Sequence, residues 1–388
     1  MNRVTRLGNL TTRTFLNRHW QKSPRLIRKA FPKLISPISA DELAGLACEP
    51  GVESRLVIKI RRQPGWLVRH GPFTVQEFRT LPEKHWTLLV HDTDKQLPEL
   101  ADFLTHFQFI PNWRIDDLMI SYAPDGGSVG PHVDAYDVFL LQVQGRRRWS
   151  ISRKPQAPAI KPGLELKQVR AFKPQHTWIL EPGDMLYLPP GVAHHGVAVG
   201  NCMTFSIGFR APTDAEMLAD LSNLLLMRLD KEARYTDANL APADTDPGLI
   251  TKQARATIRQ RMRGAQHLSS GKLDEWFGRF ITEPKSWLVP NPPRRSLTPA
   301  ALRTQFATRK ELARDPAVRM AWYDDGAQQI KMFVNGCCHP LPVRLSEFAR
   351  MLCSQRLYSS RQLGSWMPDR DAIRLLAELY NAGMLYFP

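Results

Sequence analysis

The sequence predicts a mainly β chain with α elements, in which a β-sandwich or barrel is followed by a helical region and a compact winged-helix module. Three observations predict this order. Short β-prone runs separated by Gly, Pro and Asp fill residues 56–209. Apolar residues at helical spacing follow Thr213. Hairpin turn signals and two further helices come after a proline-rich stretch at 284–293, and a chain of 388 residues is long enough for two or three domains.

The first region contains clear runs of strand character, each bounded by turn residues. Many short strands with turns between them are typical of a sandwich or a barrel. The runs are Trp86–Val90, Leu118–Ala123, Val138–Val143, Arg147–Ser152, Met185–Leu188 and Met203–Phe209.

A capping box opens the helical region. Thr213 and Glu216 are spaced so that each side chain can accept a hydrogen bond from the other residue's backbone N–H. Helix-forming sequence then continues to about Phe280. The first helix carries an apolar stripe, which predicts core packing or a helix–helix interface. The stripe consists of Met217, Leu218, Leu221, Leu224, Leu225 and Leu229.

The last module combines a β-hairpin with two helices and a closing strand. A winged helix often binds nucleic acid, but residues 344–388 hold six Arg against four Asp or Glu. This weak charge favours a structural or protein-docking role. The predicted parts are turns at Asp324–Gly326 and Asn335–Gly336 around the strand Ile330–Val334, helices near Leu345–Cys353 and Asp369–Ala382, the helix cap Gly383, and the strand Met384–Phe387.

The positive charge is concentrated in two segments. The chain has 53 Lys and Arg against 37 Asp and Glu, a net charge of +16. Residues 1–40 carry nine of the basic residues and residues 250–272 carry six, and neither segment contains an acidic residue. Such segments either contact phosphates, for instance on RNA, or are solvated basic faces.

Composition also bears on the compartment. The five cysteines are scattered and odd in number, which favours a reducing compartment over a disulfide framework. No apolar run approaches the roughly eighteen residues that a membrane span needs. The Arg- and Thr-rich start resembles a transit peptide in composition, but Phe15, Leu16 and Trp20 predict folded structure there. We therefore expect a cytoplasmic protein.

Two segments within the β region predict a metal site. A lone His-x-Asp is usually an ordinary strand pair, but here, in Gly130-Pro-His132-Val-Asp134, strand alternation would place His132 and Asp134 side by side. Residues 181–195 then combine a turn, a strand and a Pro-Pro-Gly corner that delivers His194 to the barrel mouth. Two histidines and one carboxylate leave three octahedral positions open, an arrangement typical of non-haem Fe(II) oxygenases.

The adjacent His195 competes with His194 for the same role. Neighbouring residues on a strand face opposite ways, so only one of the two reaches the metal. The Pro-Pro-Gly-x-x-His spacing selects His194. His195 is then either a hydrogen-bonding residue behind the ligands or a residue of the rim.

The open metal positions call for a co-substrate, and an oxoacid would chelate two of them. Its remote carboxylate needs a cation that stays charged, which favours arginine. Arg147 shares a strand face with Trp149 and Ile151, which is the face to bury, whereas Arg146 and Arg148 lie on the other face. Arg147 is therefore predicted to point inward; the alternative is that all three arginines line a basic edge.

Three hydroxyl groups are further candidates near the oxoacid. Thr204 and Ser206 alternate with apolar residues on the last predicted strand, and Ser121 precedes the His-x-Asp loop. Each either contacts the oxoacid or its water, or is a satisfied strand hydroxyl.

With these residues assembled, the chain resembles the JmjC-type ribosomal oxygenases, and among them the bacterial ribosomal-protein arginine hydroxylases. The resemblance extends over essentially the whole chain. One departure is His195, since members of the family tend to carry an acidic residue there, and this changes the charge at the pocket mouth. The blocks that carry the resemblance are Phe15–Pro24, Trp113–Ser121, Gly130–Phe139, Gly145–Trp149, Glu181–Asp184, Ser206–Pro212 and Arg234-Tyr235.

The resemblance implies a fold and a domain order. Residues 1–211 would form a double-stranded β-helix of the jelly-roll, cupin type, which is the JmjC oxygenase domain. Residues 212–288 would form a helical dimerisation region, and residues 289–388 a winged helix. Together with the leucine stripe, this implies a homodimer.

The resemblance also implies the chemistry. Fe(II) would lie on His132, Asp134 and His194, and 2-oxoglutarate on Arg147 and Ser121. The reaction would convert 2-oxoglutarate and O2 to succinate and CO2 while hydroxylating Cβ of an arginine in large-subunit ribosomal protein sixteen. A guanidinium substrate should meet carboxylates near the pocket, unless these pair with the chain's own arginines. The candidate carboxylates are Asp116, Asp117 and Asp137.

Other functions fit parts of the sequence. A metal-barrel sensor with a DNA-binding winged helix would show salt-dependent DNA binding by residues 290–388. A cupin-type isomerase or dioxygenase would need no oxoacid, and an inward Arg147 argues against it. A JmjC hydroxylase or demethylase of another protein side chain would share the iron chemistry and differ only in its product.

Overall fold

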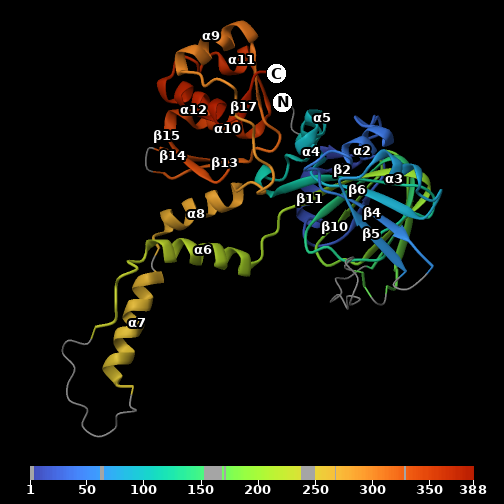
Figure 1. Cartoon of the computed structure of the whole chain (residues 1–388), viewed down its shortest axis with the longest axis horizontal. Coiled ribbons are helices and arrows are strands. Elements are labelled where there is room, and N and C mark those ends of the chain that lie inside the picture. Colours follow the sequence, from blue (N-terminus) through green and yellow to red (C-terminus); the bar gives the residue numbers. More distant parts are fainter. Residues whose placement is uncertain are drawn as a thin grey trace.

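The structure, a computed structural model, describes residues 4–61, 65–152, 168–169, 172–236, 250–266, 268–326 and 329–388. A curved β-sheet structure, a set of helices and a compact C-terminal module follow one another along the chain (Figure 1). Within the described ranges no helix has both the length and the apolar character needed to cross a membrane.

One nine-stranded sheet forms the first part of the molecule. Its strands run in the order β3-β10-β8-β11-β7-β6-β4-β5, with β9 paired to β8, and every pairing is antiparallel. The sheet curls into the barrel seen in Figure 1, as a jelly-roll fold requires. The strands are β3 (Arg25–Ile27), β4 (Ser54–Lys59), β5 (Trp66–His70), β6 (Trp86–Val90), β7 (Ile115–Ala123), β8 (Val138–Ile151), β9 (His176–Leu180), β10 (Met185–Leu188) and β11 (His194–Phe209).

The predicted strands are confirmed, with two differences. The expected run Met203–Phe209 is the second half of the longer strand β11. The expected runs Val138–Val143 and Arg147–Ser152 form a single strand, β8, of 14 residues. Gly145 between them has a positive φ of 63°, and β11 changes register opposite it. Gly145 therefore makes an irregularity within the strand rather than a turn, because glycine adopts this conformation without a steric penalty.

Aromatic side chains from the N-terminal segment close one end of the barrel core. Phe15, on α1 (Thr12–Arg18), is fully buried, and its ring packs edge-on against Tyr187 at 4.8 Å between ring centroids. Trp20 packs on Tyr187 and Phe209. The prediction that folded structure begins near Phe15 and Trp20 is confirmed. Short elements cover the rest of the surface: β1 (Arg6–Leu7), β2 (Leu10–Thr11), α2 (Ala40–Leu46), α3 (Val75–Arg79), α4 (Thr93–Gln96) and α5 (Pro98–Phe103).

Three helices follow the barrel: α6 (Asp214–Arg228), α7 (Lys252–Gln266) and α8 (Ser270–Thr282). The predicted capping box is present at the start of α6, where Thr213 and Glu216 exchange hydrogen bonds. The apolar stripe does not enter the core of this chain, because α6 has no buried residue. Of the two expectations for the stripe, core packing is therefore wrong and a helix–helix interface remains.

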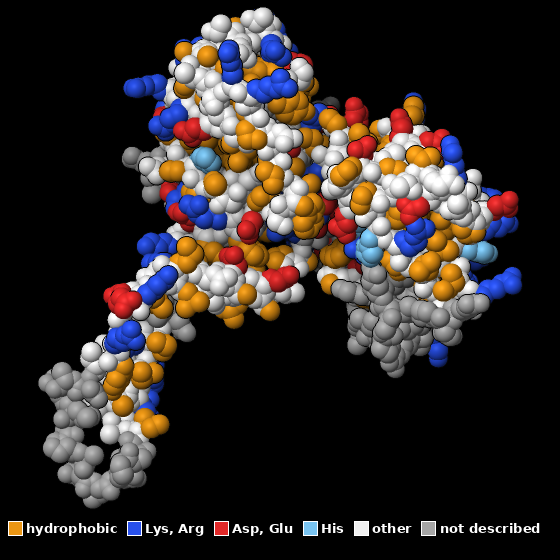
Figure 2. Space-filling view, in the orientation of Figure 1, with side chains coloured by type: hydrophobic (Ala, Val, Ile, Leu, Met, Phe, Trp, Pro, Cys, Tyr) orange, Lys and Arg blue, Asp and Glu red, His pale blue; other side chains and the backbone are white. Residues whose placement is uncertain are grey.

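We call α6 and α7 the arm. In Figure 1 α7 projects away from the rest of the molecule, and orange side chains gather along the arm in Figure 2. Exposed apolar side chains of the arm are Leu218, Leu226, Met227, Ile258 and Met262.

The C-terminal module has its own apolar core and the predicted hairpin, helices and closing strand. It carries two three-stranded antiparallel sheets, β16-β12-β17 and β13-β14-β15. Gly383 has the expected left-handed conformation, with φ of 74°. The elements are α9 (Pro299–Arg309), β12 (Glu311–Arg314), β13 (Met320–Asp324), β14 (Gln329–Val334), β15 (Cys337–Pro342), α10 (Ser346–Ser354), β16 (Leu357–Ser359), α11 (Ser360–Leu363), α12 (Arg370–Asn381) and β17 (Leu385–Tyr386).

Ion pairs attach this module to the barrel. Arg319 pairs with Asp116 at 2.9 Å, and Arg356 pairs with Asp102 at 2.9 Å through two hydrogen bonds. The two arginine side chains are largely buried but their carboxylate partners are exposed, so these pairs lie at the edge of the interface. The module is thereby held against the part of the barrel from which β7 starts.

Candidate metal centre

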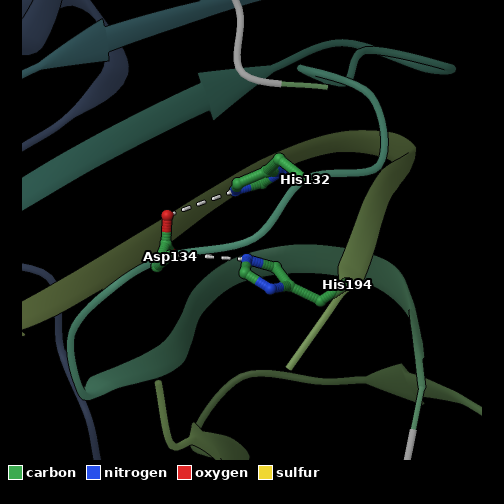
Figure 3. A group of neighbouring side chains, drawn as sticks. All are labelled: His132, Asp134 and His194. Atoms are coloured by element: carbon green, nitrogen blue, oxygen red, sulfur yellow. Dashed lines mark ion pairs between the residues drawn. The ribbon is translucent and has the colours of Figure 1, made fainter. Parts of the chain in front are cut away.

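His132, Asp134 and His194 converge at one end of the barrel (Figure 3). His132 and Asp134 lie on the segment between β7 and β8, and His194 is the first residue of β11. The backbones of the two histidines exchange hydrogen bonds of 3.0 and 2.9 Å. The carbonyl of Asp134 accepts a 2.9 Å bond from the N–H of Gly191, in the Pro-Pro-Gly corner.

The predicted convergence is present, but its expected cause is only partly right. His132 forms an isolated bridge with His194, and Asp134 is not in a strand. Two-residue alternation along a strand therefore does not place Asp134. The chain segment instead curves around the start of β11 and carries both side chains to His194.

The geometry of the three ligand atoms suits one metal ion. All lie within 4.8 Å of one another. The Asp134 carboxylate is 4.0 Å from Nε2 of His132 and 3.5 Å from Nε2 of His194. Two imidazoles and a carboxylate on one side of an ion would leave its other side open.

The tautomer of each histidine is fixed by a backbone carbonyl. Nδ1 of His132 donates to the carbonyl of Gly130 at 3.0 Å, and Nδ1 of His194 donates to that of Val192 at 2.9 Å. Because a carbonyl only accepts, each Nδ1 carries the proton and each Nε2 presents a lone pair toward Asp134. Burial and the neighbouring His132 lower the pKa of His194 to about 4, which keeps this imidazole neutral.

His195 lies apart from this group. It is half-buried and rests against the ring of Phe172, and it does not belong to the metal-capable group. Burial, together with the charges of His132 and Arg148, lowers its pKa to about 4. Its position fits the predicted rim residue.

Behind the three side chains is a cavity of about 230 Å³, which we call the barrel cavity. It is lined by inward-facing residues of β4, β6, β7, β8 and β11. The lining residues include Arg55, Thr87, His91, Asp117, Met119, Ser121, Tyr136, Arg147, Trp149 and Ser206.

Arg147 takes the inward position that strand alternation predicts. Its side chain is buried with Trp149 and Ile151, whereas Arg146 and Arg148 are exposed. Nη1 of Arg147 donates to Oγ of Ser121 at 3.2 Å. Its Nε and Nη2 are buried and have no hydrogen-bond partner among the described residues. A buried cation with unused donors indicates an anion site.

The three predicted hydroxyl groups differ in position. Ser121 and Ser206 line the barrel cavity. Thr204 donates to Oε1 of Gln142 at 3.0 Å and does not line the cavity, so it is the satisfied strand hydroxyl that was the alternative. Sequence reasoning missed Thr87, whose buried hydroxyl lines the cavity without a partner in the described chain. The sequence shows that Thr87 and Leu89 share a strand face. It does not show that β6 lies beside β7, which is what brings Thr87 to the cavity.

Only one of the three candidate carboxylates reaches the cavity. Asp117 lines it, while Asp116 pairs with Arg319. Asp137 is fully buried and accepts a hydrogen bond from the Tyr187 hydroxyl at 2.5 Å and from Gln21 at 2.9 Å. Asp116 and Asp137 are thus structural partners of the chain's own side chains.

Comparison with known proteins identifies the family. A JmjC domain model matches residues 102–217, a ROXA-like winged-helix model matches residues 265–386, and an AraC-like ligand-binding domain model matches residues 169–267. The ribosomal protein uL16 3-hydroxylase of Escherichia coli K12 is 36% identical over 374 residues, which is 96% of each chain. The chain belongs to the JmjC-domain ribosomal oxygenases.

Other members of the ribosomal oxygenases give the same result. A probable ribosomal oxygenase of Haemophilus influenzae is 38% identical over 219 residues, or 55% of this chain and 53% of the relative. The X-ray structure of E. coli ycfD superposes with a TM-score of 0.85 at 34% identity, covering 98% of this chain and 99% of that one. A structure of the E. coli ribosomal oxygenase in complex with cobalt and 2-oxoglutarate has a TM-score of 0.82 over the same shares. The present chain is a ribosomal oxygenase with the same β-rich JmjC fold and C-terminal winged helix.

Proposed function

We propose that His132, Asp134 and His194 hold Fe(II) and that Arg147 and Ser121 bind 2-oxoglutarate. The donor set supports the metal, because two neutral imidazoles and a carboxylate are the ligand set of non-haem iron oxygenases. The unused Nε and Nη2 of Arg147 support the oxoacid, since a carboxylate would satisfy both donors. The related E. coli structure that contains cobalt and 2-oxoglutarate supports the same pairing.

Each residue of the site then has a separate task. When bound, Fe(II) supplies the oxidising chemistry that converts 2-oxoglutarate and O2 to succinate and CO2 and transfers one oxygen atom to the substrate. Arg147 and Ser121 orient the oxoacid, and Ser206 is a further hydroxyl on the same cavity wall. The guanidinium carbon of Arg147 lies 5.8 Å from the centre of the Trp149 ring, and this ring excludes water from the Arg147 end of the cavity.

The substrate we propose is a ribosomal protein, hydroxylated at Cβ of an arginine in large-subunit ribosomal protein sixteen. The name of the E. coli relative, a ribosomal protein uL16 3-hydroxylase, supports the protein and the carbon. The cavity supports an arginine side chain, because it offers Asp117 to a guanidinium and Met119 and Tyr136 to its aliphatic stem. We also propose a cytoplasmic location, which a ribosomal-protein substrate supports.

The observation that carries the proposal is the buried Arg147 with two unused donors beside the His-Asp-His group. The test incubates the purified protein with Fe(II), 2-oxoglutarate and ribosomal proteins, and measures each protein by mass spectrometry. We expect a mass gain of one oxygen atom on an arginine of large-subunit protein sixteen. An unchanged mass for every ribosomal protein contradicts the proposed substrate.

We further propose three domains: residues 1–211 form the oxygenase domain, residues 212–288 the dimerisation region and residues 289–388 the winged helix. The exposed apolar residues of the arm support a homodimer, because an unpartnered apolar face in water favours association. A single sedimenting species of dimer mass at micromolar protein supports this; a monomer at that concentration contradicts it.

The polar face of α7 supports a contact with ribosomal RNA. Lys252, Arg255, Arg259 and Arg263 recur at three- and four-residue spacing, so they lie along one side of the helix. None of the four has an ion-pair partner among the described residues. Salt-dependent binding of an RNA oligonucleotide, weakened when these four are changed to Gln, is the expected result; salt-independent or unchanged binding contradicts it.

A further inference from the structure

Three carboxylates, Asp92, Asp116 and Asp117, lie together where the barrel cavity meets the C-terminal half of the chain. Two of them have a cation of their own. Nζ of Lys285 contacts both oxygens of Asp92, at 2.7 and 3.0 Å, and Arg319 pairs with Asp116 at 2.9 Å. Asp117, the one that lines the cavity, has no Lys or Arg partner within the described ranges.

Asp117 is nevertheless held firmly. Its Oδ2 accepts the backbone N–H of Asp92 at 3.3 Å and lies 3.7 Å from Nδ1 of His91. Burial acts against the charged form of Asp117, but the nearby His91 and the charge of Lys285 outweigh it, so the pKa of Asp117 lies below its ordinary value. The group facing the cavity is therefore a carboxylate with one oxygen anchored.

The anchor depends on an unusual backbone turn. Asp92 has a φ of 53°, the left-handed conformation that a residue other than glycine adopts at a cost. The turn continues into α4, which is hydrogen-bonded to β7, the strand that carries Asp117. Oγ1 of Thr93 donates to the carbonyl of Leu118 at 2.6 Å, and Asp94 accepts the N–H of Leu118 at 2.8 Å. The α4 turn thus fixes the start of β7, where Asp117 lies.

Lys285 comes from a distant part of the chain, just beyond α8. Asp92 is 3% exposed, so its charge needs this partner. Burial acts against the charged form of Lys285, yet Asp116, Asp117 and Asp92 raise its pKa. The lysine is charged at neutral pH and compensates the cluster from the side away from the cavity.

We infer that Lys285 is a positioning residue for recognition of the substrate. By compensating Asp92 it stabilises the left-handed turn that anchors Asp117, and it leaves the charge of Asp117 available to a cationic side chain in the cavity. The inference rests on the proposed function, because the cation it addresses is the guanidinium of a substrate arginine. It makes the segment after α8 part of substrate recognition, although Lys285 itself does not line the barrel cavity.

Removal of Lys285 has a definite consequence. In Lys285→Met, the buried carboxylate of Asp92 has lost its cation, and a buried charge without a partner favours rearrangement or protonation. Either change loosens the N–H of Asp92 from Asp117. This displacement of Asp117 weakens binding only of a substrate that interacts with its charge.

The test is a double-mutant cycle between the enzyme and its substrate. Wild type and Lys285→Met are assayed with two peptides of the ribosomal protein, one carrying the target arginine and one carrying citrulline, its neutral isostere, in its place. Affinity for each peptide is measured by calorimetry, and KM and kcat are measured with the arginine peptide. We expect Lys285→Met to weaken binding of the arginine peptide and raise its KM roughly tenfold, with kcat changed less. Binding of the citrulline peptide is expected to be unchanged between the two enzymes.

Two control variants separate positioning from general damage. Lys285→Arg preserves the cation and is expected to restore affinity for the arginine peptide. Lys331→Met removes another lysine–carboxylate pair, Lys331 with Glu275 at 3.0 Å, which does not line the cavity, and is expected to leave binding of both peptides unaffected. Equal losses for arginine and citrulline peptides, or no loss for either, overturn the inference. If wild type itself does not distinguish the two peptides, the proposed arginine substrate is what fails.

Discussion

The barrel and the arm differ in how far their side chains are contacted by the rest of the chain. In the barrel, contacts from within the chain orient the central side chains of the candidate site: the carbonyls of Gly130 and Val192 fix the two imidazoles, and Ser121 accepts a hydrogen bond from Arg147. On the arm, Met227 is 82% exposed and Leu218 is 63% exposed, and α6 buries none of its residues. The barrel keeps unused hydrogen-bond donors inside a cavity, on Arg147, whereas the arm keeps unpartnered apolar side chains in water. The first feature suits the oxoacid that we propose for the barrel, and the second suits the dimer that we propose for the arm.

The largest expected effect is loss of the metal ligands. Changing Asp134 to Ala should lower 2-oxoglutarate turnover by roughly 10³-fold or more, because a two-imidazole site holds the ion weakly and without the charge of the carboxylate. The fold should persist, since Asp134 is about one-fifth exposed and lies outside the strands. Turnover and circular dichroism measure activity and fold, and a variant that keeps substantial turnover would show that Asp134 is not a metal ligand.

Arg147→Met is expected to act on binding and on stability in opposite directions. Affinity for 2-oxoglutarate should fall by roughly 10- to 100-fold, the effect of losing charge-assisted hydrogen bonds. In the absence of 2-oxoglutarate the same variant should unfold at a higher temperature, because it removes a buried cation with two unsatisfied donors. Arg148→Met, on the exposed face of the same strand, is the control and should change neither quantity. A lower unfolding temperature would mean that Arg147 is satisfied by the protein alone.

On the arm, the double change Leu218→Glu and Leu226→Glu should convert the proposed dimer to a monomer. Both side chains are more than half exposed, so the substitutions create no buried charge in the monomer. Binding of 2-oxoglutarate to the barrel should remain within about twofold, since the arm contributes nothing to the cavity. Sedimentation and ligand titration measure the two outcomes. A matched loss of 2-oxoglutarate binding would show that barrel and arm are not independent.

The smallest expected effect concerns the start of the arm. Thr213→Ala removes the capping box of α6 and should cost that helix about 1 kcal/mol. Because α6 is not buried in the core, the loss should appear as faster amide hydrogen exchange in its first turn, while the unfolding temperature of the barrel stays unchanged. A shifted barrel transition would indicate that α6 and the barrel unfold as one unit.

Much of the site was predictable, since it depends on short-range rules. Two-residue alternation placed Arg147 inside and Arg146 and Arg148 outside, and the Pro-Pro-Gly spacing chose His194 over His195. The strand-rich first region and the capping box followed from local patterns in the same way.

The rest depended on which segments become neighbours. Asp116 and Asp117 are adjacent in sequence, yet one pairs with Arg319 from the C-terminal module and the other faces the cavity. No local rule distinguishes them, because the partner lies about two hundred residues away. The leucine stripe of α6 was ambiguous for a similar reason, since helical periodicity does not say whether the covering surface is in the same chain.

The backbone bonds between His132 and His194 have a consequence for metal exchange. The two imidazoles belong to paired backbone segments, and the Nδ1 of each ring is hydrogen-bonded to a backbone carbonyl. The fold therefore fixes the position of both rings. Asp134 has no strand pairing, and its side chain is about as exposed as that of His132, but its carboxylate lacks the hydrogen bond to a backbone carbonyl that fixes each imidazole. Ions that differ in radius would be accommodated by rotation of one carboxylate rather than by a change in the barrel.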